Sequence, residues 1–344
     1  MHPSEVYWSA CYNAILWQIR YNLQNTAMTH RLPILLTLLL AATGVLTAVN
    51  SLHSQGGSNA TRGATPPPPA ATEGANVPQA KVLLEAAIRA LDSRGSISAR
   101  IRQQAKLFGH QLIGSGRYLE SHRTLVPLIR LELTIEIAEH VTTSLVQVCD
   151  GRNLWTYRKL LSRESVSQID AVRASDALKR LAVTIEPNSS TVVPGLGGLS
   201  RLLRGLDATF QFISAEKGRI DDLPVWKIEG GWKPAQLIKL LPNQKDAIEH
   251  GRPIDLSPLP EHLPDRVILL LGQEDLFPYR MDYCRFIVKK KDPVVVENRA
   301  LMTVEFYEVN FNMPIDVRQF IYNPGVVEKI DQTEAFLESL GAGK

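Results

Sequence analysis

The chain has 344 residues, of which 44% are hydrophobic, and this is enough apolar material for a sizeable core. Its 38 Lys and Arg nearly balance its 35 Asp and Glu, and the basic residues are spread along the chain apart from the run at 289–291. These values exclude the concentrated basic surface of a nucleic-acid-binding protein, and the length allows two average domains or one large domain with tails.

An uncharged apolar segment at residues 32–49, LPILLTLLLAATGVLTAV, predicts export or membrane anchoring. It is longer than the apolar core of most cleaved signal peptides and barely reaches the length that spans a bilayer. A cleaved signal peptide and an uncleaved single-pass anchor therefore both stay open. Residues 1–31 form an N-terminal tail, in which Met28 stands where the short basic region of a signal peptide would begin and is a candidate true start.

Residues 50–78 are rich in Gly, Ser, Thr, Ala and Pro and nearly lack large apolar side chains. Such a segment cannot bury enough surface to order itself, so we expect a flexible tether. Residues 79–344 then form the exported domain, with a Pro-rich insertion at about 233–264.

The exported domain opens with a predicted helix at 79–93 and continues mainly as strands. The clearest alternation is LIRLELTIEI, residues 128–137, whose apolar side chains point to one side. An Asp-Gly pair at 150–151 predicts a hairpin, and a short helix near 173–183 is expected to be capped by Ser175 or Asp176. About nine or ten strands in hairpin succession predict a mainly β (α+β) fold, an incomplete, strongly curved antiparallel barrel wrapped around helices.

The last long strand contains a phase change. Met302, Val304 and Phe306 share one face, but after Tyr307 the apolar residues stand at odd positions. A shift of one residue is what a β-bulge produces, and bulges bend a sheet. Gly114 and Gly116, which stand in an earlier predicted strand, likewise permit a bend or bulge in a curved sheet.

Sites of chemistry are not indicated. Cys149 and Cys284 stand on predicted strands and could form one disulfide, although a strand cysteine is more often a buried free thiol. No Cys/His spacing fits a zinc site, and the glycines at 195–205 lack the Lys-Ser/Thr of a phosphate loop. We therefore expect no metal, no cofactor and no catalysis.

Several short motifs resemble the LolA-type periplasmic lipoprotein carriers and their relatives, which include sensor domains of the RseB type. They are GSGRYLE, LIRLELTIE, LVQVCDGRNLWTYR, PVWKIEG and VEFYEVNFNMPIDVRQFIYNP. The terminal pattern of that family falls on Asn312, Pro314, Asp316, Phe320 and Pro324, and its Asp-Gly turn with an aromatic strand falls on Asp150, Gly151, Trp155 and Tyr157.

The resemblance implies an apolar cavity that accepts a lipid or lipoprotein acyl chain, in the bacterial periplasm or cell envelope, with residues 32–49 as a tether to the inner membrane if they are retained. The alternative is a packed barrel without lipid cargo that acts as an envelope protein-interaction or sensor domain. The ligand-cavity candidates are Leu131, Leu133, Ile135, Ile137, Trp155, Tyr157, Phe210, Phe212, Trp226, Val304 and Phe306. The lid candidates are Gly195, Gly197, Gly198, Leu202 and Leu203.

Overall fold

The computed structural model describes residues 77–107, 110–137, 142–160, 163–184, 195–260, 262–289 and 295–340. The predicted tail, the apolar segment 32–49 and nearly all of the tether lie outside the described residues. Within the described ranges, no helix combines the length and the hydropathy that crossing a bilayer requires.

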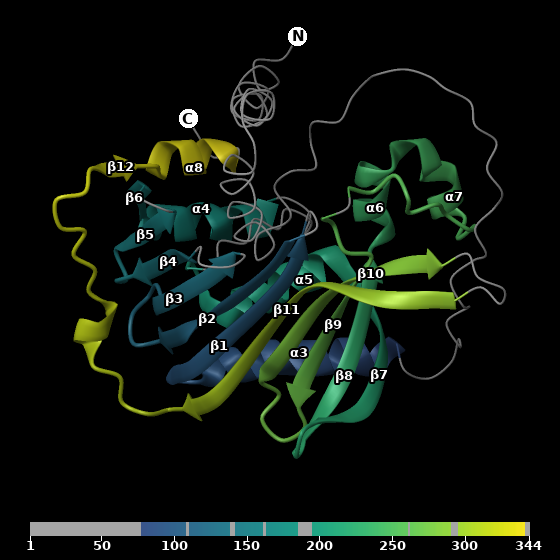
Figure 1. The fold of residues 1–344 in the computed structure, drawn as a ribbon, viewed down its shortest axis with the longest axis horizontal. Helices are drawn as coiled ribbons and strands as arrows, with labels where there is room; N and C mark the ends of the chain where they lie inside the picture. The colour runs from purple at the N-terminus through teal and green to yellow at the C-terminus, as the bar shows by residue number, and fades with distance from the viewer. Residues whose placement is uncertain are drawn as a thin grey trace, which may run out of the picture.

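Twelve strands of the described chain form one sheet (Figure 1), in the order β12-β6-β5-β4-β3-β2-β1-β11-β10-β9-β8-β7. Neighbouring strands are antiparallel, except that β12 runs parallel to β6. The two edge strands, β7 and β12, are not paired with each other, so the sheet is open. The strands are β1 Ser96–Leu107, β2 His110–Ser121, β3 Leu128–Ile137, β4 Thr142–Cys149, β5 Asn153–Leu160, β6 Arg163–Asp170, β7 Phe210–Ile220, β8 Leu223–Trp232, β9 Arg266–Gly272, β10 Pro278–Lys289, β11 Val295–Phe311 and β12 Lys329–Asp331. This architecture confirms the predicted mainly β, incomplete antiparallel barrel. The described chain has twelve strands where about nine or ten were predicted, and β12 was missed because its three exposed residues carry no apolar alternation.

Helices α3 (Val77–Ser93) and α5 (Gly198–Thr209) lie on the same side of the sheet (Figure 1), and we call that side the inner face. Their apolar side chains and the inward side chains of the strands form the main core. Leu84 and Leu203, one from each helix, are fully buried in it. The helices therefore occupy the interior of the curved sheet, as the sequence predicts.

Helix α4 (Ala171–Thr184) begins earlier than the sequence suggests. The backbone N–H of Arg173 donates to the Asp170 carboxylate at 2.9 Å. Ser175 and Asp176, the predicted caps, are inside the helix. The prediction was wrong because the carboxylate that ends β6 is the nearest acceptor for the free N–H groups of the first turn.

The bulge predicted in the last long strand is confirmed. In the pairing of β11 with β1, Asn310 faces Ser98 but Tyr307 faces Arg100, so two residues of β11 oppose one of β1. Glu308, inside this bulge, has a φ of 50°. The β10–β11, β9–β10 and β7–β8 pairs also shift register, and each shift adds bend to the sheet.

Asn312 ends β11 in the left-handed region, with a φ of 57°. Its side-chain oxygen accepts a 2.9 Å hydrogen bond from the Gly95 N–H, and its own N–H donates to the Ser96 carbonyl at 2.9 Å. Asn tolerates this conformation better than most residues. The end of β11 is thereby tied to the junction of α3 and β1.

Two further parts lie beside the sheet. The insertion at 233–264 contains α6 (Pro234–Leu240), η1 (Pro242–Gln244) and α7 (Lys245–Glu249), which build a small core of their own around Leu237 and Ile248. The C-terminal strap, residues 312–332, includes η2 (Val317–Phe320) and packs Phe320 on the face opposite to the helices, against Leu119 and Leu128. Helix α8 (Thr333–Ser339) follows the strap.

Candidate functional site

The inner face of β3 contains the apolar row that the sequence singled out. Leu131, Leu133 and Ile135 are buried in the main core. The pairing register places them beside Gln147, Leu145 and Thr143 of β4. The side chain of Ile137 lies outside the described residues.

The candidates from the other half of the sheet reach the same core. Phe210 and Phe212 on β7, and Val304 and Phe306 on β11, are buried in it, while Trp226 packs against it partly buried. The inner face is therefore continuous from β3 to β7, the opposite edge of the sheet.

Two predicted cavity residues lie on the other face. Trp155 pairs with Val148 and Tyr157 with Val146, one position out of phase with the inward residues Leu145 and Gln147. The Trp155 ring lies 6.0 Å from that of Tyr322, which belongs to the C-terminal strap. Aromatic character indicated burial but not direction, and the period of two shows that the inward residues of β5 are Leu154, Thr156 and Arg158.

The lid candidates lie at the start of α5 and inside it. Leu202 and Leu203 are buried in the core, and a Cβ built on Gly195 would meet the Leu154 side chain at 2.5 Å. Gly197 and Gly198 both have positive φ, 90° and 69°. The segment 195–198 therefore lies directly on β4 and β5 and turns there into the helix.

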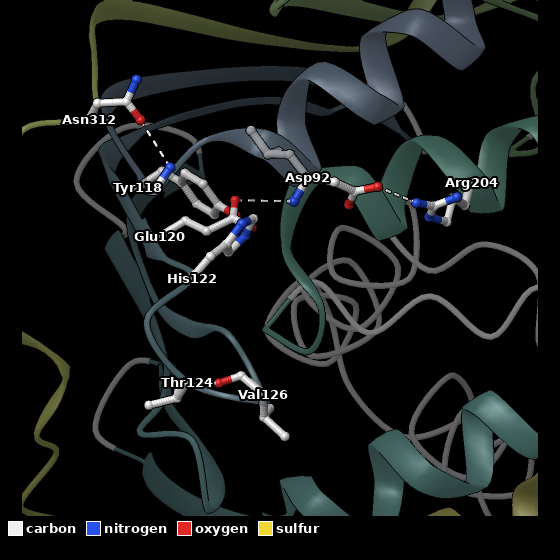
Figure 2. A network of polar contacts seen from close by, with 10 residues as sticks. Asp92, Tyr118, Glu120, His122, Thr124, Val126, Arg204 and Asn312 are labelled. Carbon is white, nitrogen blue, oxygen red and sulfur yellow. Dashed lines mark hydrogen bonds and ion pairs between the residues drawn. The ribbon is translucent and has the colours of Figure 1, made fainter.

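A buried carboxylate holds the start of α5 (Figure 2). Glu120, on the inner face of β2, is 1% exposed. It accepts hydrogen bonds from the Tyr118 hydroxyl at 2.5 Å and from the Leu199 N–H at 3.4 Å, and His122 Nε2 lies 2.7 Å from its Oε1. A Cβ on Gly198 would stand 1.8 Å from the same carboxylate, so only glycine permits this approach. The carboxylate also complements the positive end of the helix dipole.

The ion pair between Asp92 of α3 and Arg204 of α5 adds a second attachment, visible in Figure 2. We call Tyr118, Glu120 and His122 the α5 latch. It was missed in the sequence because no motif marks it, although the alternation in GSGRYLES already places Tyr118 and Glu120 on one face. Burial and the neighbouring Glu120 both raise the pKa of the Tyr118 hydroxyl, so it stays protonated and donates.

The latch predicts a pH dependence of stability. The hydrogen bond to Glu120 raises the pKa of His122 above its ordinary 6.5, against the lowering effect of burial. Protonated His122 therefore contributes stability that is complete below the unfolded-state pKa and is lost as pH rises through the higher folded-state pKa. We expect the gap in thermal unfolding temperature between wild type and His122→Gln to be largest at about pH 6 and to shrink by about pH 9. A gap of constant size across this range contradicts the assignment.

Cys149 and Cys284 are both buried and free. They lie on β4 and β10, with β3, β2, β1 and β11 between them, and strands about 4.8 Å apart place them far beyond disulfide reach. The disulfide that the sequence left open is therefore absent from the structure. Burial raises the pKa of each thiol to about 11.

Among the described residues, no group of three or more His, Cys, Asp or Glu side chains is arranged to hold a metal ion.

No family model and no curated protein matches the chain. Among solved structures, it is similar to LprF from Mycobacterium bovis at 12% identity and a TM-score of 0.34, over 71% of this chain and 98% of that one. It is similar to a domain described as an outer membrane lipoprotein-sorting protein from Vibrio parahaemolyticus at 9% identity and a TM-score of 0.28, over 70% and 97%. A third structure is the complex of MucA and MucB from Pseudomonas aeruginosa, at 10% identity and a TM-score of 0.28, over 71% and 61%.

One of these solved structures is described as a lipoprotein-sorting domain. With TM-scores of 0.34 and below, they do not assign a function to this chain.

Proposed function

We propose that the described domain is a non-catalytic binding module of the bacterial cell envelope, and that its ligand is a lipid or lipoprotein acyl chain. The proposal rests on one observation: helix α5 covers the apolar inner face of the sheet and begins at a glycine-rich segment. The apolar row of β3 is buried, while the nearby helix α5 starts at a glycine-rich segment and is held there by the Glu120 carboxylate.

The mechanism is an exchange of contacts. Leu199, Leu202, Leu203 and Leu206 of α5 are buried in the core. If the start of α5 lifts, an acyl chain takes the place of these side chains on the inner face, at about 0.8 kcal/mol for each buried methylene. The cost of exposing α5 is offset only if the chain is long, which favours an acyl tail over a small apolar molecule.

The place in the cell follows from the N-terminal sequence. The apolar segment 32–49 favours export, and the Gly/Ser/Pro-rich residues after it favour a tether between membrane and domain. If the segment is retained, the protein works at the inner membrane, and if it is cleaved, the protein diffuses in the periplasm.

The proposal is tested on the full chain, produced with its own N-terminal segment and analysed by native mass spectrometry. Co-purified species with masses of lipids or acylated peptides support it. A fluorescent fatty acid that gains intensity on addition of the protein, and loses it when unlabelled fatty acid competes, gives a second readout. A protein that carries no such species and does not bind the probe rejects the acyl-chain function.

A second function, binding of an envelope protein or sensing through it, is favoured by the C-terminal strap. Four apolar side chains of the strap expose between 53% and 104% of their surface: Val317, Ile321, Val326 and Ile330. Exposed apolar side chains are a feature of many protein-protein contact surfaces. The test is the variant Ile321→Ser. If it abolishes capture of an envelope protein and leaves acyl binding intact, this second function is favoured.

A further inference from the structure

The inner face changes character from β3 to β6. Its side chains on β3 are apolar, whereas the inward positions of β4, β5 and β6 include amide, hydroxyl and guanidinium groups, assigned by the pairing register. We call this part of the inner face the polar corner. Its members are Thr143, Gln147, Thr156, Arg158, Arg163, Ser165 and Ser167.

Gln147 is the first sign that the polar corner binds something. Gln147 is 4% exposed, and among the described residues its Oε1 has no hydrogen-bond partner. Its Nε2 makes one long contact of 3.4 Å to the Thr156 hydroxyl. A buried amide oxygen without a donor costs free energy, so a ligand with a hydroxyl or amine hydrogen gains by reaching it.

Arg158 is the second sign. It faces Leu145 on β4 and Ser165 on β6. Its side chain is exposed to solvent, yet enough protein surrounds the guanidinium for partial desolvation to lower its pKa. Within the described part of the chain, no carboxylate pairs with it. An accessible cation in a concave setting, with no protein anion, is suited to an anionic ligand.

The charge around Arg158 has one sign. The described inward positions of β3 to β6 contain no Asp or Glu, and Arg163 adds a second cation on β6, one inward position beyond Ser165, which faces Arg158. The nearest acid in sequence, Glu164, lies out of phase with these positions and is bound to Lys159 at 2.9 Å. Glu120 is inward but is engaged in the α5 latch. Within the described ranges, the polar corner therefore attracts anions without a competing carboxylate.

We propose that the polar corner is the head-group site of an anionic phospholipid whose tails lie along the apolar row of β3. This inference rests on the proposed function, because the tail must occupy the inner face. The phosphate contacts Arg158 and Arg163, and a hydroxyl of the head group donates to Gln147 Oε1. Leu145 lies beside both Arg158 and Leu133, so it joins the head-group site to the apolar row of β3 along which the tails lie.

The test is a titration of the full chain with water-soluble short-chain phosphatidylglycerol, short-chain phosphatidylcholine and inorganic phosphate, followed by isothermal calorimetry. We expect the wild type to bind the anionic lipid about tenfold more tightly than the zwitterionic one. Arg158→Gln should remove this preference by weakening phosphatidylglycerol binding far more than phosphatidylcholine binding, because the choline cation already offsets the phosphate charge of phosphatidylcholine. Arg123→Gln is the matched control, because Arg123 is an exposed arginine in the loop after β2.

The outcomes separate the two proposals. Equal binding of both lipids by the wild type, or an equal loss of both in Arg158→Gln at unchanged melting temperature, overturns the head-group site and leaves acyl binding standing. Binding of inorganic phosphate as tight as that of phosphatidylglycerol, with the same dependence on Arg158, shows a free anion site and overturns the lipid source. Binding of neither lipid overturns the proposed function together with the site.

Discussion

Gly116→Ala is expected to destabilise the domain by about 3 kcal/mol or more. A Cβ on Gly116 would stand 1.7 Å from the backbone oxygen of Glu132 on the neighbouring strand. That oxygen belongs to the β2–β3 ladder and cannot rotate away as a side chain would. The two strands would have to separate, which opens the inner face at its apolar row. Urea unfolding followed by tryptophan fluorescence measures the loss.

Gly218→Ala is the matched control, since Gly218 is also a glycine inside a strand. A Cβ there would lie 3.7 Å from a methyl group of Val225, an ordinary contact. Inside a strand, alanine is usually more stable than glycine by about 0.5–1 kcal/mol, so this variant should be as stable as the wild type or slightly more stable. If both variants lose the same stability, the close approach of β2 and β3 is not the cause.

Glu120→Ala is expected to cost about 3 kcal/mol and to loosen α5 selectively. The change leaves the buried Tyr118 hydroxyl without its acceptor, removes the partner of His122 and takes the acceptor from the Leu199 N–H. Hydrogen exchange measured by mass spectrometry should show faster exchange in α5 than in β9 or β10. Glu120→Gln should cost less, because the amide oxygen still accepts from one of the donors.

Glu136→Ala serves as the control for this result, because Glu136 is an exposed acid on β3. It should change neither the free energy of unfolding nor the exchange of α5. If Glu120→Ala lowers the protection of all strands equally while α5 shows no extra exchange, the carboxylate is a general core element and not a latch. The same pair of variants tests the lid, since a loosened α5 should speed the uptake of a fluorescent fatty acid.

Much of the strand pattern was predictable because it depends on local physics. The alternation in LIRLELTIEI placed Leu131, Leu133 and Ile135 on the face that is buried. The phase change after Tyr307 predicted the β11 bulge before any pairing partner was known. In both cases the side-chain period of two is a property of the strand itself.

The wrong predictions have one cause in common. In each case the orientation or the partner of a side chain was decided by a segment that is distant in the sequence or whose end was not known. Trp155 and Tyr157 were assigned to the cavity for their aromatic character, but the strap with Tyr322 covers the opposite face of the sheet and offers them burial there. The Ser175 or Asp176 cap was preferred because the end of β6 was not known. Arg158 was overlooked because an isolated arginine in a strand usually points to water.

The sequence by itself determined most of the strands, where the long β11 bends, and which residues of each strand share a face, since these follow from residue type and a repeat of two. Only the tertiary structure decided which face meets the helices and what each inward polar group meets there. Leu199 donates to Glu120 across 79 residues, and the β1–β11 pairing joins segments about two hundred residues apart. Contacts of that kind are selected by the closure of the whole sheet, because burial requires each polar atom to find its partner in space and not along the chain.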